Sequence, residues 1–112
     1  MPDQGDIVLV PVPFTDLTST RRRPVIVVSN AVYHQATEDM VVVAMTSNPN
    51  QTSYSFVITD ADLEAGSLNH PGTVRADKIF TLSRSIIVKA FGRVQSAVLD
   101  RIRQIMTDVV KT

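Results

Sequence analysis

The feature that most limits the fold is a change of hydrophobic period near residue 95. Before it, apolar residues occur in short runs rich in valine and isoleucine, a composition typical of β-strands. After it, residues 96–110 carry apolar side chains at helical spacing with charged side chains between them. The apolar positions are Val98, Leu99, Ile102, Ile105, Met106, Val109 and Val110. We therefore expect several strands followed by one amphipathic helix, with Ser96 as its cap.

The short apolar runs predict a mainly antiparallel β structure. They cover residues 6–12, 24–30, 39–48, 52–59, 72–83 and 85–94. Residues 13–23 are expected to form a polar loop, and Pro24 to begin the second strand. Residues 60–66 suit a short helical turn capped by Asp60 and ended by Gly66, and Gly92 marks a bulge or bend. The expected fold is mainly β with α: a small antiparallel β-barrel or strongly curled sheet, closed by the C-terminal helix.

Length and composition limit the classes of protein to consider. The 112 residues suit a single domain over residues 1–112, and the 11 basic and 11 acidic side chains cancel. A neutral chain is poorly suited to coating nucleic acid nonspecifically, although a local site remains possible. The lack of cysteine excludes disulfides and thiolate metal sites. With no signal-peptide pattern and no apolar run near ~20 residues, we expect a cytoplasmic protein without a membrane partner.

The densest positive charge lies in "TSTRRRPVIVVSN", residues 18–30, directly before an apolar strand. The residue before a proline is pushed into extended geometry, so the backbone of Arg23 is partly fixed by Pro24. A guanidinium stays charged and offers a planar fork that fits a phosphate. We therefore predict that one of these arginines faces a phosphate, a task for which Arg23 is suited. A solvated loop position is the alternative for all three arginines, and the favoured one for Arg21 and Arg22.

Two further groups of polar residues could act on a phosphate. The hydroxyl of Thr46, where an apolar strand turns polar, could bond a phosphoryl oxygen or simply cap the strand end. Arg75 and Asp77 are two residues apart, so on a strand they share a face while Ala76 points the other way. They could serve as acid and base or form a structural ion pair. An arginine holds its proton tightly, so Arg75 suits a charge clamp better than a proton donor. Nearby cations should lower the pKa of Asp77 and make it a weak base.

His34 and His70 are the only side chains with an ordinary pKa near neutrality, so either could be a general base. Each is isolated and lacks metal-binding spacing, so no metal or cofactor is expected. The stretch "LNHPG", residues 68–72, is typical of a turn. A surface position is expected for His34, with a place in a binding groove as the alternative.

The order of these motifs resembles that of a known family. "GDIVLVPVPFTD" followed by "RRRPVIVVSN" resembles the opening of the MazF/PemK/Kid toxins of bacterial toxin–antitoxin systems. "VVVAMTSN" and "GTVRADKIFTL" are similar to the family's third strand and its later Arg-x-Asp strand. The resemblance implies an SH3-like or CcdB-like barrel and a sequence-selective endoribonuclease that cuts single-stranded RNA without a metal. It also implies a homodimer, which would cover apolar strand faces that the helix leaves free.

The resemblance also implies partners and site residues. Arg23 and Thr46 fall on the family's catalytic arginine and threonine, and some members are thought to use the pair matched by Arg75 and Asp77. An antitoxin is expected to inhibit by laying its C-terminal segment across the RNA groove, and DNA is reached only through that antitoxin.

Substrate contacts are expected around these positions. The candidate RNA contacts are Ser47, Lys78, Arg22 and His34. Lys78 and Phe80 stand where many relatives carry glutamine and arginine, so the preferred RNA sequence should differ from that of the best-known members.

Cleavage of this kind needs a base for the 2′-hydroxyl proton, positive charge on the phosphoryl oxygens and a proton for the leaving 5′-oxygen. It would leave 2′,3′-cyclic phosphate and 5′-hydroxyl ends. Two alternatives use the same fold without this chemistry. One is a CcdB-like poison of DNA gyrase, although the ending "TDVVKT" lacks the Trp-Gly-Ile finish of that group. The other is a catalytically silent relative that only binds its antitoxin.

Overall fold

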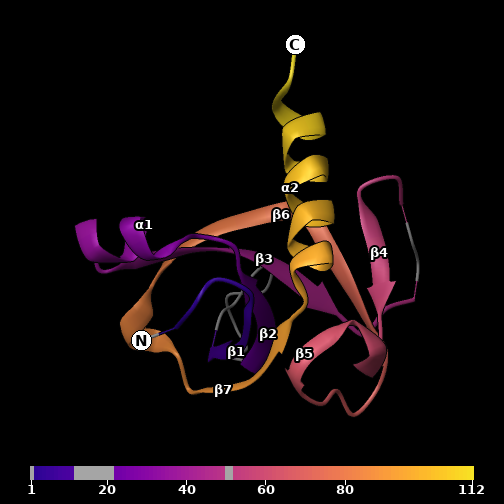
Figure 1. Cartoon of the computed structure of the whole chain (residues 1–112), viewed down its shortest axis with the longest axis horizontal. Helices are drawn as coiled ribbons and strands as arrows, with labels where there is room; N and C mark the ends of the chain where they lie inside the picture. The colour runs from indigo at the N-terminus through magenta and orange to yellow at the C-terminus, as the bar shows by residue number, and fades with distance from the viewer. Residues whose placement is uncertain (1, 12–21, 50–51) are drawn as a thin grey trace.

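The computed structural model describes residues 2–11, 22–49 and 52–112. In these ranges the chain forms seven strands, two α-helices and two 3-10 turns (Figure 1). The strands are β1 (Asp6–Pro11), β2 (Arg22–Val27), β3 (Asp39–Thr46), β4 (Ser55–Ile58), β5 (Leu63–Gly66), β6 (Gly72–Ser83) and β7 (Lys89–Val94). The helices are α1 (Ala31–Ala36) and α2 (Ser96–Val110), and the turns are η1 (Asp60–Asp62) and η2 (Arg84–Ile86). No helix of these ranges is long and apolar enough to cross a membrane.

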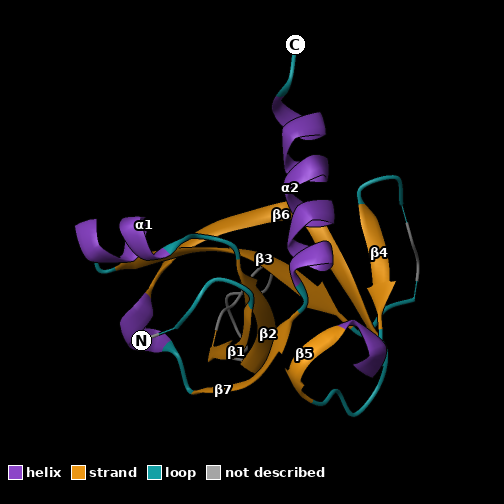
Figure 2. Cartoon of the chain, viewed as in Figure 1, coloured by secondary structure: helices purple, strands orange, loops and turns teal. Residues whose placement is uncertain are grey.

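The strands form one antiparallel sheet in the order β4-β6-β3-β2-β1-β7-β5. The sheet curls strongly, and α2 stands against one side of it (Figure 2). The prediction of a curled, mostly antiparallel sheet with a C-terminal helix is confirmed. The predicted polar loop lies mostly outside the described residues, but Arg22 and Arg23 belong to β2.

Each face of the curled sheet has its own apolar core. On the helix face, strand residues such as Ile7, Ile26 and Val43 pack with Val98 and Ile102 of α2. The opposite face, which we call the inner face, is lined by Val8, Val10, Val25, Val27, Met40 and Val42. These six side chains are 0% exposed in the single chain, because the sheet curls over them and brings partly buried apolar residues against them. They need no second subunit to become buried.

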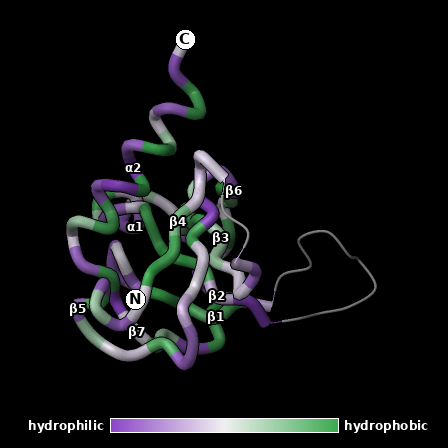
Figure 3. Tube along the Cα trace, turned by 90° about the vertical axis from the view of Figure 1, so that its right-hand side faces the viewer, coloured by the Kyte–Doolittle hydropathy of each residue, from purple (hydrophilic) through white to green (hydrophobic). Residues whose placement is uncertain are grey.

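The C-terminal turns of α2 extend past the sheet, beyond the apolar strands (Figure 3). Val98, Ile102 and Ile105 are buried as predicted, whereas Val109 and Val110 are exposed. The predicted capping role of Ser96 is wrong, because Gln95 occupies the N-cap position and makes no side-chain hydrogen bond there.

Two short segments depart from the predicted pattern. Asn30 begins the unpredicted helix α1, and its side chain accepts a hydrogen bond from the Tyr33 amide, so β2 ends earlier than expected. The turn at residue 60 is capped by Thr59 instead of Asp60, and Leu63–Gly66 continue as strand β5 instead of helix. The bulge predicted near Gly92 is confirmed by the register shift between β1 and β7, which leaves Phe91 between paired positions.

Candidate active site

The strand register brings Arg23 and Thr46 to the same end of the sheet and to the same face. Val25 lies opposite Ala44, and extending this register by two residues places Arg23 opposite Thr46. Residues directly opposite one another on neighbouring strands project to the same face. Arg23 also lies opposite Val10, whose side chain belongs to the inner face. Both predicted site residues therefore project from the inner face, away from α2.

Arg75 reaches the same face from β6. It lies opposite Ala44 of β3, while Thr73 lies opposite Thr46. Since Ala44 and Thr46 are two residues apart on β3, they share a face, and Arg75 shares it with them. Ala76 is fully buried in the helix-face core, as the predicted alternation requires. The sheet thus gathers two guanidinium groups and one hydroxyl on adjacent strands.

A two-pronged ion pair holds Arg75 to Asp77. Nε and Nη2 of Arg75 donate to Oδ1 and Oδ2 of Asp77, each over 3.1 Å. These hydrogen bonds are the main reason that the pKa of Asp77 is lowered, and the nearby positive charge of Lys78 adds to the effect. The Asp77 carboxylate is therefore charged at neutral pH and a weak proton acceptor. Its hydrogen bonds fix the orientation of the Arg75 guanidinium.

Asp77 and Lys78 lie in an irregular part of β6. Pairing with β3 passes from Ala44–Arg75 to Val43–Ile79, so Ala76, Asp77 and Lys78 fall between two register positions. Bulges of this kind redirect side chains and are common beside active sites. The predicted RNA contact Lys78 belongs to this bulge and follows Asp77 directly in the chain.

Thr46 has two of the predicted RNA contacts near it, Ser47 and Arg22. Thr46 Oγ1 accepts a hydrogen bond from the Asn48 amide over 3.2 Å, so its hydroxyl proton can still be donated to a ligand. Ser47, the next residue, is exposed. Arg22 is exposed as well, but consecutive strand residues point to opposite faces, so Arg22 projects away from the face of Arg23.

His34 occupies a different part of the molecule. It lies on α1 with 4% of its surface exposed, so the expected surface position is wrong. Its Nε2 is 2.7 Å from Ser29 Oγ, which also accepts a hydrogen bond from the Val41 amide. Burial, together with the charge of Arg84, lowers the pKa of His34. Val41 is near the opposite end of β3 from Thr46, so His34 is not gathered with Arg23 and Thr46.

The lowered pKa of His34 predicts a pH dependence of stability. As the pH falls through the ordinary histidine pKa of about 6.5, the unfolded chain takes up a proton before the folded chain does. The free energy of unfolding should therefore decrease from pH 7.5 toward pH 5 and level off once the folded protein is also protonated. Urea denaturation at several pH values measures this. In His34→Gln, the free energy of unfolding should vary less with pH in this range. The same pH dependence in the variant and the unaltered protein would contradict a buried, neutral His34.

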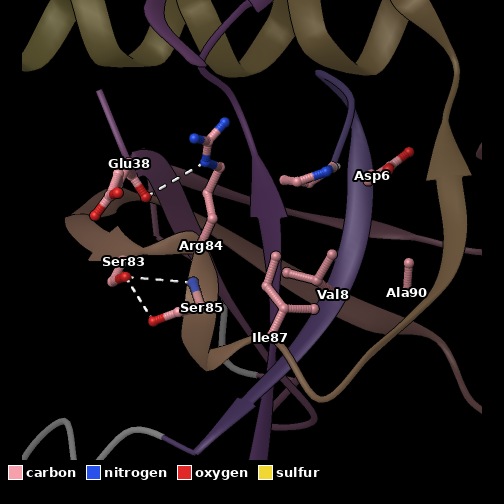
Figure 4. Close-up of a pocket in the computed structure, with 9 residues that line it drawn as sticks. Asp6, Val8, Glu38, Ser83, Arg84, Ser85, Ile87 and Ala90 are labelled. Carbon is pink, nitrogen blue, oxygen red and sulfur yellow. Dashed lines mark hydrogen bonds between the residues drawn. The ribbon is translucent and has the colours of Figure 1, made fainter. Parts of the chain in front are cut away.

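Arg84, which no sequence pattern predicted to be important, connects α1 to the end of β6. Its Nη1 and Nη2 donate to the carbonyl oxygens of His34 and Thr37, each over 2.9 Å, and its Nε donates to that of Glu38 over 3.3 Å. Only the contacts between segments far apart in sequence reveal this role. Arg84 also borders a hollow of about 520 Å³ (Figure 4). On the rim of this hollow, Ser83 Oγ accepts a hydrogen bond from the Ser85 amide and lies 2.8 Å from the Ser85 hydroxyl. These polar groups are therefore used within the fold.

Comparisons with known proteins identify the family. Residues 3–110 match the family model of the PemK-like, MazF-like toxin of type II toxin-antitoxin systems. A mycobacterial structure of an endoribonuclease in complex with its cognate antitoxin is 21% identical, with a TM-score of 0.79 over 98% of this chain and 95% of that one. A MazE-MazF structure from Deinococcus radiodurans is 26% identical, with a TM-score of 0.73 over 99% and 96% of the two chains. No curated protein matches the sequence. With a family match across nearly its whole length, the chain belongs to the PemK-like, MazF-like toxins of type II toxin–antitoxin systems.

Proposed function

We propose that this chain is an endoribonuclease that cuts single-stranded RNA by attack of a ribose 2′-hydroxyl on the neighbouring phosphorus. One observation carries the proposal: Arg23, Thr46 and Arg75 project from one face of three adjacent strands. Two cations and a hydroxyl donor on one face suit a phosphate that gains negative charge. The mycobacterial relative with a similar fold is itself named an endoribonuclease.

In the proposed reaction, the 2′-oxygen forms a bond to phosphorus while the bond to the 5′-oxygen breaks. The charge that develops on the non-bridging oxygens is stabilised by the guanidinium groups of Arg23 and Arg75 and by the Thr46 hydroxyl. One proton leaves the 2′-hydroxyl and one is delivered to the departing 5′-oxygen. The products are a 2′,3′-cyclic phosphate and a 5′-hydroxyl. The guanidinium groups supply the charge neutralisation, so the proposed cleavage proceeds without a metal ion.

Asp77 is proposed as a positioning residue for Arg75 and not as the base. Both of its oxygens accept hydrogen bonds from Arg75, which holds its pKa below the ordinary range. Arg75→Ala should lower the cleavage rate by about 10²-fold, as loss of one stabilising donor does elsewhere. Asp77→Asn should lower it by less than about 10-fold, because the general base would remain. Single-turnover cleavage rates measured across pH test this assignment. Asp77 would instead be the base if Asp77→Asn lost more than about 10-fold in rate and the acidic limb of its pH–rate profile disappeared.

An antitoxin and a second subunit are proposed as the protein partners. A carboxylate-bearing peptide segment of an antitoxin would compete with phosphate for Arg23 and Arg75. The MazE-MazF structure from D. radiodurans is a relative determined together with MazE. For the homodimer, the exposed Val109 and Val110 at the end of α2 offer apolar surface that a two-fold contact would cover.

The proposed activity is tested by incubating the purified protein with a long single-stranded RNA in the presence of EDTA. We expect discrete fragments whose new ends carry 5′-hydroxyl groups, and equal cleavage with and without the chelator. Intact RNA at high protein concentration would contradict the endoribonuclease. Loss of cleavage on chelation, or 5′-phosphate ends, would contradict the 2′-hydroxyl mechanism.

A further inference from the structure

A hollow of about 210 Å³ adjoins Thr46 at the end of the sheet. Its walls come from β2, β3, β7, the start of β6 and the segment that precedes it. Its lining includes Pro24, Met45, Thr46, His70, Gly72 and Phe91. From the sequence, His70 is expected only in a turn and as an isolated possible base. The structure brings it to the same hollow as the threonine of the candidate active site.

Thr46 links this hollow to the phosphate-binding face. Arg23 and Thr46 project from the inner face, whereas Met45 belongs to the helix-face core and Pro24 alternates with Arg23 along β2. The hollow therefore lies across the strand ends from the guanidinium groups. A nucleotide whose phosphate contacts Arg23 and Thr46 could place its base over these strand ends and into the hollow.

The lining suits one flat ring system. Phe91 and His70 contribute aromatic rings, and Pro24, Met45 and Pro71 contribute apolar surface. The volume is below the about 300 Å³ at which pockets for drug-sized ligands begin. Unpaired bases of RNA are commonly bound by stacking on aromatic side chains, with polar groups reading their edges. Here Ser47 and Asn69 are exposed polar residues on the lining.

The walls of the hollow are held by close backbone packing. A Cβ atom on Gly72 would lie 2.9 Å from Met45 Sδ, so β3 and β6 already touch at this point. Phe91 sits at the β1–β7 bulge, and its carbonyl would be 2.3 Å from a Cβ atom on Gly66. A hollow formed in advance lowers the ordering cost of binding, which favours affinity.

We infer that this hollow binds one unpaired nucleobase beside the scissile phosphate, with His70 and Phe91 as its stacking residues and as determinants of sequence preference. The inference rests on the proposed function, because RNA is the ligand that supplies the base. It makes His70 an RNA-binding residue and leaves proton transfer to another group.

Fluorescence anisotropy with labelled, single-stranded 2′-O-methyl RNA tests the inference, because this RNA lacks the attacking hydroxyl and stays intact. A series of oligonucleotides carries one abasic position each. We expect His70→Ala to weaken binding of the complete oligonucleotide by about 5- to 100-fold, the usual effect of losing one stacking contact. With the abasic position at the hollow, His70→Ala and the unaltered protein should bind equally. His70→Phe should restore binding, and Gln35→Ala, at an exposed position of α1, should change nothing.

Equal binding by His70→Ala and the unaltered protein would overturn the inference, as would the same affinity loss with every abasic oligonucleotide. Loss of binding in His70→Phe would also overturn it, since stacking is retained there. Failure of the unaltered protein to bind any RNA would overturn both this inference and the proposed function. If binding depends on the base and on His70 but unmodified RNA is not cleaved, the inference that the hollow binds a base would stand. Only the proposed endoribonuclease activity would then be overturned.

Discussion

Arg23→Ala is expected to reduce the RNA cleavage rate by about 10²- to 10³-fold, because it removes a charged donor from the developing negative charge. The free energy of unfolding should change little, since Arg23 is only partly buried near the start of β2. Arg23→Lys should retain a small part of the rate, because an ammonium keeps the charge but loses the planar fork. Cleavage of a defined RNA under single-turnover conditions, with urea denaturation of each variant, measures both effects.

Arg22→Ala is the matched control. Arg22 is the neighbouring residue on the same strand, but its side chain points to the opposite face. It should retain near-normal cleavage with only a modest loss of RNA affinity from the removed charge. Undiminished cleavage in Arg23→Ala, or equal losses in both variants, would remove Arg23 from the proposed mechanism.

Gly66→Ala should destabilise the fold by about 3 kcal/mol or more, the largest stability effect we expect from a single methyl group. Gly66 has a φ of +81°, a conformation that side chains disfavour. An added Cβ would also lie 2.3 Å from the Phe91 carbonyl oxygen and 2.6 Å from the Gly92 Cα atom. These are backbone atoms of the paired strand β7, so they cannot move aside without breaking the β5–β7 pairing.

Gly5→Ala separates the cost of the positive φ from the cost of the clash with β7. Gly5 also has a positive φ, +95°, but the nearest atom to an added Cβ is the flexible Leu99 Cδ1 at 3.3 Å. It should lose only the about 1–3 kcal/mol of an unfavourable backbone conformation. Chemical denaturation of both variants gives the comparison. Equal losses, or a stable Gly66→Ala, would contradict the close approach of β5 to β7.

The hydrophobic period predicted the larger elements because they depend on local pattern. β-Branched runs gave β1, β2, β3 and β6, and the helical spacing of residues 96–110 gave α2 with its bounds. The short elements depend on contacts that no window of sequence contains. Helix α1 has only six residues and is held by Arg84, 50 positions beyond His34, while β5 exists because Leu63–Gly66 pair with β7.

The candidate site was predictable only where it depends on local spacing along one strand. The period of two along a strand placed Arg75 and Asp77 together, and the structure shows them joined by two hydrogen bonds. That Arg23 and Thr46 lie on adjacent strands follows from the register of β2 against β3, which sequence spacing does not determine. His34 illustrates the converse: an isolated polar residue looked exposed, yet its hydrogen bond to Ser29 allows it to be buried.

The location of the RNA site is tested most directly by NMR titration of the isotope-labelled protein with a non-cleavable single-stranded RNA. We expect the largest shifts at the side-chain Nε–H signals of Arg23 and Arg75 and at the amides of Thr46 and Ser47. Signals of α1 and of the solvent-exposed side of α2 should stay in place. Shifts confined to α1, α2 or the hollow beside Arg84 would contradict a phosphate site on the inner face.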